Sequence, residues 1–204
     1  MATETAEQVI QAATRLFAER GYDGVSVRDI CTAAEVSANA VHYHFKSKQG
    51  LYEQIIERFG LAKQEAAERI LVGTPKDTDE FATRLEIFAR EILESLLSEP
   101  DVLTITQMEM LQGFRHGGES FAKSKEQCLG ALRAYVETAQ GAGIVREGVD
   151  PAYVVGTLMD RVFNQAIYAS SLRQMYDASI DDPDYRAEWV RKTVDLLVNG
   201  LKSN

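Results

Sequence analysis

The chain has 204 residues, 45% of them apolar, and its 22 Lys+Arg and 31 Asp+Glu give a net charge of −9. This length and apolar content suffice for a hydrophobic core and disfavour a disordered chain. Acidity by itself argues against a nucleic-acid partner, because neutralising phosphates requires positive charge. The charge is uneven, however: residues 1–50 carry a net −1 and the remaining 154 carry −8.

Neither a membrane segment nor an export signal is predicted. The longest uncharged apolar stretch, Val162–Leu172, has 11 residues, short of the roughly 18 that span a bilayer. The amino terminus places acidic residues before its first apolar ones, unlike an export signal. We therefore expect a cytoplasmic protein. Cys31 and Cys128 have no Cys or His at ligand spacing, so we expect packed thiols and neither a metal nor a cofactor.

The predicted fold class is all-α with about nine helices. Apolar residues recur every three or four positions, and no stretch alternates as a half-buried strand does. The first helix ends at Gly21, and Ser26 and Ser37 cap two short helices. Ser47 caps a longer helix that fades before Gly73. Further helices are expected over residues 81–99, 102–114, 120–141, 150–176 and 183–201.

The two short helices are typical of a helix-turn-helix, because the second is too short and too polar for a core. Apolar residues from Val27 to Phe45 would lock the pair together. The outward set combines an amide, imidazoles, a phenol and small side chains, which suit a major groove. It comprises Arg28, Ala38, Asn39, Ala40, His42, Tyr43 and His44. Lys46 and Lys48 flank the next helix start, where cations and free amides can hold a phosphate.

The stretch ERGYDGVSVRDICTAAEVSANAVHYHFKSKQGLYEQI resembles the amino-terminal domain of the TetR family of bacterial transcriptional regulators. The shared features are a Gly-aromatic pair after the first helix, a Ser opening the second, and aromatic-His-Phe-x-x-Lys-x-x-Leu at the last junction. The resemblance covers about residues 5–60 by motif. It implies a helix-turn-helix DNA-binding domain over 1–50, with a larger helical effector-binding and dimerisation domain over 51–204.

The resemblance also implies residue roles and partners. Ser26 and Arg28 would lie at the DNA backbone, and Lys48 at a phosphate. Bases would face Ala38, Asn39, Ala40 and His42, and base edges or phosphates would face Tyr43 and His44. A homodimer would place its recognition helices in successive major grooves of a palindromic operator. This chain has His42 where the family most often has an aromatic, so its operator cannot be taken from better-known members.

Alternatives exist for each candidate. His42 and His44 are two positions apart and point away from one another on a helix, which disfavours a metal pair. Tyr43 could instead be a packed aromatic, Asn39 an ordinary surface amide, and the two lysines solvated charges.

Large apolar residues of the carboxy-terminal part suit core packing, and some could instead line an effector cavity. The cavity candidates are Phe88, Gln107, Met108, Phe114, Phe121, Met159 and Phe163. Nearby polar residues, among them Glu109 and His116, could orient a ligand or form interhelical hydrogen bonds. The last two helices have wide apolar faces, which suggests a partner surface. The dimer candidates are Val155, Val162, Trp189, Val194 and Leu197.

Three function classes are compared. An all-helical enzyme has thin support, because no catalytic triad order, metal-binding pair or phosphate loop occurs. An architectural module would use the helix-turn-helix only for packing. The favoured hypothesis is a sequence-specific transcriptional regulator, a repressor released from its operator by a small-molecule effector.

Overall fold

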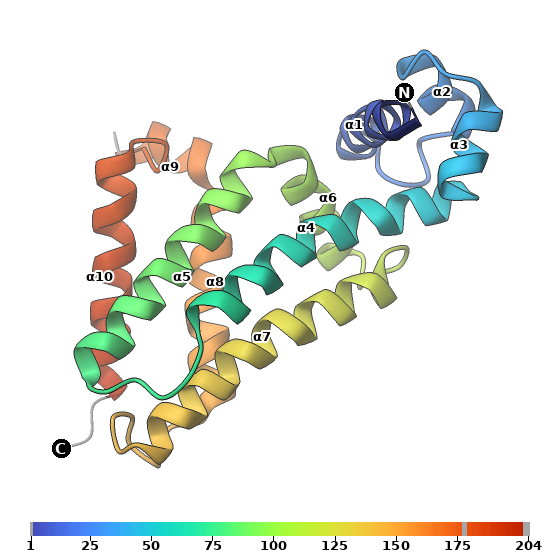
Figure 1. Ribbon diagram of the computed structural model, residues 1–204. Helices are drawn as coiled ribbons and strands as arrows, with labels where there is room; N and C mark the ends of the chain where they lie inside the picture. The colour runs from blue at the N-terminus through green and yellow to red at the C-terminus, as the bar shows by residue number, and fades with distance from the viewer. Residues whose placement is uncertain (1, 177–178, 202–204) are drawn as a thin grey trace. The chain divides into compact units, whose positions relative to one another are not determined.

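The computed structural model describes residues 2–176 and 179–201, and these form an all-helical fold (Figure 1). Ten helices are present within these ranges: α1 (Ala2–Arg20), α2 (Val27–Ala33), α3 (Ala38–Phe45), α4 (Lys48–Ile70), α5 (Thr78–Ser98), α6 (Pro100–Leu111), α7 (Gly118–Gly141), α8 (Pro151–Ile167), α9 (Ala169–Tyr176) and α10 (Pro183–Leu201). The all-α prediction is confirmed. None of the helices in the described ranges has the length and apolar character needed to cross a bilayer.

Two local predictions have different outcomes. The capping box at the start of α2 is confirmed, since the Asp29 amide donates to Ser26 Oγ at 3.2 Å and the Ser26 amide donates to Asp29 Oδ2 at 2.8 Å. The Ser26 hydroxyl also donates to the Asp29 carboxylate, and this hydrogen bond, followed by the one from the Ser26 amide, lowers the pKa of Asp29. The segment predicted as one helix over 150–176 instead breaks at Tyr168, between α8 and α9. No glycine or proline marks that break in the sequence.

The chain packs as two compact units. The first unit contains the chain up to Leu61 together with Glu99–Ser124, and the second contains Ala62–Ser98 and the chain from Lys125 onward. The sequence predicts a boundary after residue 50, whereas the packing groups α6 and the first turns of α7 with the helix-turn-helix. The reason is that α1 packs against α6 as well as against α2 and α3.

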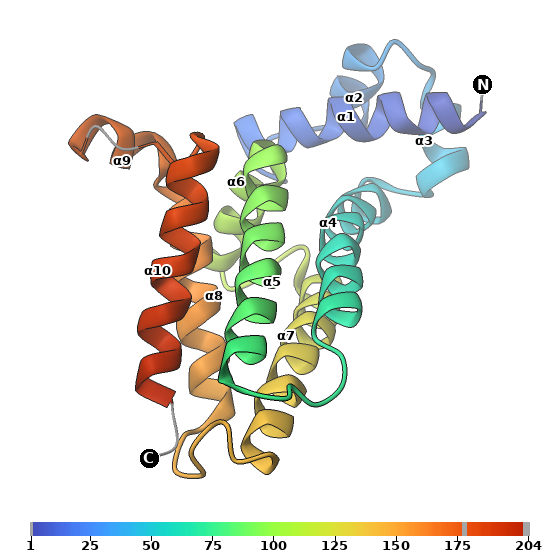
Figure 2. The ribbon, with the colours of Figure 1, turned by 60° about the vertical axis from the view of Figure 1, so that its left-hand side comes forward.

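The core of the second unit lies between α5, α8 and α10, which run side by side (Figure 2). Its α5 contributes a continuous apolar face from Phe81 to Leu96. Both Val162 of α8 and Val194 of α10 are fully buried in this core. The Tyr135 ring of α7 stacks on Phe81 with 5.5 Å between ring centroids, and burial raises the pKa of Tyr135 to about 12.

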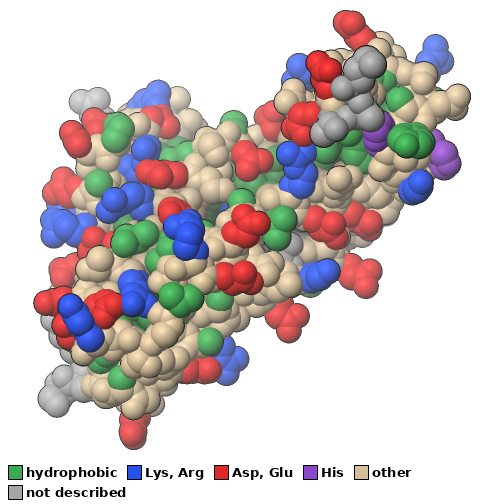
Figure 3. All heavy atoms as spheres, in the orientation of Figure 1, with side chains coloured by type: hydrophobic (Ala, Val, Ile, Leu, Met, Phe, Trp, Pro, Cys, Tyr) green, Lys and Arg blue, Asp and Glu red, His purple; other side chains and the backbone are tan. Residues whose placement is uncertain are grey.

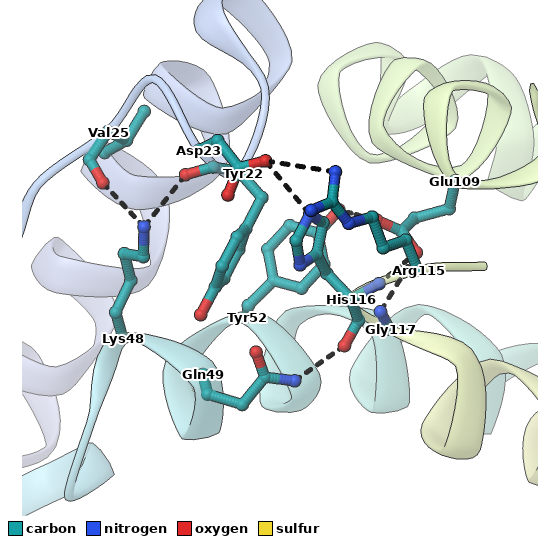
Figure 4. Close-up of polar contacts among 10 residues, drawn as sticks. All are labelled: Tyr22, Asp23, Val25, Lys48, Gln49, Tyr52, Glu109, Arg115, His116 and Gly117. Atoms are coloured by element: carbon teal, nitrogen blue, oxygen red, sulfur yellow. Dashed lines mark hydrogen bonds and ion pairs between the residues drawn. The ribbon is translucent and has the colours of Figure 1, made fainter. Parts of the chain in front are cut away.

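In the first unit, the buried Glu109 carboxylate joins α6, α4 and the turn between α6 and α7 (Figure 4). One carboxylate oxygen accepts from Tyr52 Oη at 2.9 Å. The other accepts from the backbone amides of His116 at 3.1 Å and Gly117 at 2.9 Å. A buried carboxylate is costly unless donors satisfy it, and these three donors do so. Burial, then the hydrogen bond to Glu109, raises the pKa of Tyr52.

Gly117 packs closely against α4 in this turn. A Cβ there would lie 2.2 Å from Ile56 Cδ1 of α4, closer than any van der Waals contact. The glycine therefore allows the turn to approach α4 closely enough for its amide to reach Glu109. The alternative in which Glu109 and His116 form interhelical hydrogen bonds agrees with this geometry.

We predict that Glu109→Ala lowers the free energy of unfolding by about 3 kcal/mol, because one phenol and two amides lose their acceptor in a buried site. Urea unfolding followed by circular dichroism measures the loss. The control Glu65→Ala, at an exposed position of α4, should change stability by less than about 0.5 kcal/mol. Equal effects of the two substitutions would contradict the role given to Glu109.

We also predict that the Cys128 thiol is unreactive in the folded protein. Burial raises its pKa to about 11, so only a small fraction is thiolate at pH 8, and the thiolate is the nucleophile. Iodoacetamide at pH 8, followed by mass spectrometry, should leave Cys128 unmodified in buffer and alkylate it in 8 M urea. Rapid alkylation in buffer would show that the thiol is accessible.

Candidate nucleic-acid interface

The helix α3 presents almost all of its side chains to solvent. Its eight residues are too few for a stable isolated helix. Val41 and Phe45, 1% and 5% exposed, anchor it by packing on α1 and α2, at about 1.5–3 kcal/mol per buried side chain. The Ser37 hydroxyl caps it by accepting from the Ala40 amide at 3.3 Å. The helix is therefore held from one side and free on the other.

The free side of α3 carries the residues predicted to read DNA. Ala38, Asn39, His42 and Tyr43 are exposed, and Ala40 and His44 are partly exposed. Figure 3 shows histidine, hydrophobic and basic side chains close together over α3, and the sequence of the helix contains no acidic residue. This surface offers amide, imidazole, hydroxyl and methyl groups to a groove without repelling phosphates.

The structure bears on two of the alternatives for α3. Tyr43 is 73% exposed, so it is not a packed aromatic of this chain. Its ring meets the His44 ring edge-on, with 5.0 Å between centroids. Among the described residues, no group of three or more His, Cys, Asp or Glu side chains is placed to hold a metal ion.

The residues beside α3 that are predicted to contact the DNA backbone differ in how exposed their side chains are. Arg28 on α2 is exposed. The Ser26 hydroxyl is engaged in the cap with Asp29. It would therefore support DNA binding indirectly, by stabilising the amino-terminal end of α2. Lys46 is exposed and ends α3 with a φ of +68°, which turns the chain sharply toward α4.

Lys48, predicted at a phosphate, instead points into the protein. Its ammonium donates to the carbonyl oxygens of Tyr22 and Val25, each at 3.0 Å, and lies 4.0 Å from the centroid of the Tyr22 ring (Figure 4). Two of its three donors are therefore used within the chain. The sequence predicted a cation at this helix start, and tertiary packing directs that cation toward the loop between α1 and α2.

The turn between α6 and α7 supplies another neighbour of Tyr22. The His116 imidazole stacks on the Tyr22 ring with 4.3 Å between centroids, and its Nε2 lies 3.4 Å from Asp23 Oδ2. The Gln49 side chain of α4 donates to the His116 carbonyl at 2.6 Å. Burial, then the charges of Asp23 and Glu53, raises the pKa of Tyr22. Sequence analysis missed Tyr22 and Asp23, whose only signal was the Gly-aromatic pair after α1.

The effector-cavity candidates do not form one cluster within a single unit. Gln107, Met108 and Phe114 belong to the first unit, whereas Phe88, Met159 and Phe163 belong to the second. Phe88 is fully buried, Met159 is 7% exposed, and Phe163 is partly exposed. The side chain of Phe121 lies outside the described part of the structure.

The dimer candidates divide by exposure. Val155, Val162 and Val194 are buried within the chain, in helices that pack against α5, which removes them from any partner surface. Trp189 and Leu197 are partly exposed. Along the outer sides of α8 and α10 runs a groove of about 580 Å³, and the residues lining it include Tyr153, Arg161, Leu196, Leu197 and Gly200. Leu196 and Tyr153 are 73% and 74% exposed.

Two protein-family models match the chain, one in each part. Residues 9–55 match the model of the bacterial regulatory proteins of the tetR family, and residues 82–197 match the tetracyclin repressor-like C-terminal domain. Over 98% of this chain and 94% of the relative, the sequence is 22% identical to the HTH-type transcriptional repressor NicS of Pseudomonas putida. A 59-residue stretch is 37% identical to the probable HTH-type transcriptional regulator YttP of Bacillus subtilis, covering 29% of this chain and 28% of that one.

Solved structures show the same fold. The transcriptional regulator FadR of Bacillus subtilis, in complex with stearoyl-CoA, superposes with a TM-score of 0.73 at 19% identity, covering 96% of this chain and 98% of that one. The ketosteroid transcriptional regulator KstR2 of Mycobacterium tuberculosis gives a TM-score of 0.72 at 16% identity, over 98% and 95% of the two chains. With an exposed recognition helix in its amino-terminal domain and a matching carboxy-terminal domain, the chain belongs to the TetR family of DNA-binding transcriptional regulators.

Proposed function

We propose that the protein is a homodimeric repressor that binds a palindromic operator through α3 and leaves it when a small-molecule effector binds in the second unit. One observation carries the operator-binding part. The helix α3 buries only Val41 and Phe45 and exposes an acid-free set of groove-reading side chains. Asn39, His42 and Tyr43 are all exposed on this helix, so amide, imidazole and hydroxyl groups are available together to base edges. Because DNA is the target, the site of action is the bacterial cytoplasm.

The charge distribution supports the same function. The net −9 of the chain would repel DNA if it surrounded α3, yet residues 1–50 carry only −1. Arg28 and Lys46 are exposed beside the recognition helix, where they would contact phosphates and set its register. The acidic remainder should keep non-specific affinity modest, since it repels DNA wherever the recognition helices are not docked.

A dimer follows from the groove along α8 and α10 and from the geometry of DNA. Two recognition helices must lie about 34 Å apart to enter successive major grooves. The exposed Leu196 and Tyr153 beside that groove would be covered by the same surface of a second copy, in an isologous contact. Trp189 and Leu197 would extend it.

Effector binding in the second unit would then change the distance between the two recognition helices of the dimer. NicS is named as a repressor and FadR is described with stearoyl-CoA, which supports ligand control in relatives of this fold. In this chain, Met159 and Phe163 are the cavity candidates of the second unit that lie nearest to its surface. Phe88, fully buried, would form the floor of such a cavity.

We predict that selection from a random DNA pool yields a palindromic sequence, and that Asn39→Ala weakens binding to it by about 1–3 kcal/mol, because a bidentate amide contact to adenine is lost. Gel shift at about 150 mM salt measures both. The control Gln174→Ala, at an exposed position of α9, should bind as tightly as the parent protein. If no sequence binds better than bulk DNA at this salt concentration, operator binding is wrong.

We also predict that Leu196→Asp converts the dimer to a monomer, because it places a charge in a buried apolar contact. Light scattering coupled to size exclusion should show the mass fall from twice the 22.7 kDa chain mass to the chain mass alone. The matched control is Leu111→Asp, at an 81% exposed leucine of α6, which should remain dimeric. A parent protein that is monomeric at micromolar concentration would rule out the dimer.

A further inference from the structure

We propose that Lys48 is a positioning residue for the recognition helix, held in place by Tyr22 and by the carbonyl oxygens of the loop between α1 and α2. The inference rests on the proposed operator-binding function. It concerns how α3 is fixed in its reading geometry, and it gives Lys48 a different role from the neighbouring Lys46.

The ammonium of Lys48 lies where the ends of four helices meet. Lys48 is the first residue of α4 and comes three positions after Phe45, the last residue of α3. Its two carbonyl acceptors, on Tyr22 and Val25, lie between the end of α1 and the Ser26 cap of α2. The Lys48 side chain therefore links the start of α4, which directly follows α3, to the loop between α1 and α2.

The link is directional as well as charged. Hydrogen bonds from an ammonium to carbonyl oxygens at 3.0 Å are charge-assisted and stronger than neutral ones. The Tyr22 ring adds a cation–π contact at 4.0 Å. To reach a phosphate with all its donors, Lys48 would have to leave both carbonyls and the ring.

Tyr22 is itself fixed from its other side. Figure 4 shows the ring between Lys48 and His116, whose centroid is 4.3 Å away. Tyr22 also packs edge-on against Tyr52, at 4.9 Å between ring centroids, and Tyr52 donates to the buried Glu109. The ring that holds Lys48 is thus part of the same packed assembly as the turn between α6 and α7.

A close approach of backbone segments at the same junction leaves little freedom for α3 to shift. A Cβ at Gly50 would lie 2.4 Å from the Phe45 carbonyl oxygen, so the first turn of α4 packs directly on the end of α3. The Ser47 hydroxyl accepts from the Gly50 amide at 3.0 Å. With Lys48 in place, the end of α3 is constrained by both side-chain and backbone contacts.

Lys46 offers a matched comparison, because it is also a lysine beside α3 but is exposed. A phosphate contact and a positioning residue have different signatures. Losing a phosphate contact weakens binding to all sequences and lowers the slope of log affinity against log salt by about one. Losing a positioning residue weakens binding to the correct sequence and leaves the salt slope unchanged.

The experiment compares Lys48→Met with Lys46→Met. Fluorescence anisotropy measures binding of each, and of the parent protein, to the duplex selected by the parent and to an unrelated duplex of equal length, from 50 to 300 mM NaCl. We expect Lys48→Met to lower the ratio of selected to unrelated affinity about tenfold with an unchanged salt slope. We expect Lys46→Met to weaken both duplexes alike and to lower the slope.

Hydrogen exchange gives a readout that does not depend on DNA. Lys48→Met should accelerate amide exchange over residues 22–26 and 46–50, whereas Lys46→Met should not. If Lys48→Met fails to fold, Tyr22→Leu replaces it, because it removes the ring without changing the charge and should lower the affinity ratio at an unchanged slope. A lowered slope with equal weakening of both duplexes, or unchanged binding and exchange, would overturn the proposal. If the parent selects no sequence while the exchange result holds, the operator-binding function fails and the structural link stands.

Discussion

An eight-residue helix must be fixed in space while nearly all of its side chains remain free for DNA, and the first unit is organised around that constraint. Only Val41 and Phe45 of α3 can be buried, because any further anchor would remove a side chain from the reading surface. Their packing prevents α3 from leaving α1 and α2. It does not by itself fix the rotation or tilt of α3, since two apolar contacts allow sliding.

The additional constraints come from polar groups just outside α3. Lys48 reaches back to two carbonyls between α1 and α2, and the Ser26 and Ser37 caps fix where each short helix begins. These contacts are directional, so they specify angles that apolar packing leaves loose. The buried Glu109 gives the same kind of support on the other side of Tyr22, through Tyr52 and the turn at Gly117.

This organisation reconciles the acidity of the chain with a DNA partner. Most of the net charge belongs to residues beyond position 50, whereas α3 contains no acidic residue and has exposed cations beside it. Two acidic residues of the first unit have structural partners: Asp29 caps α2, and Glu109 is buried among donors.

The sequence by itself determined the helices, the helix-turn-helix and its exposed reading set, because apolar periodicity, caps and residue chemistry are local properties. It also indicated the family through an ordered motif over about residues 5–60. Tertiary structure alone decided which side of each helix is covered and what each polar group contacts. Val162 and Val194 appear equivalent to Leu196 in an apolar pattern, yet the two valines are fully buried in helices that pack against α5, whereas the leucine is exposed. Lys48 reads as a surface cation and Glu109 as an ordinary acid. The two carbonyl partners of Lys48 and the Tyr52 partner of Glu109 lie 23 to 57 residues away in the chain, a distance over which local sequence carries no information about contact.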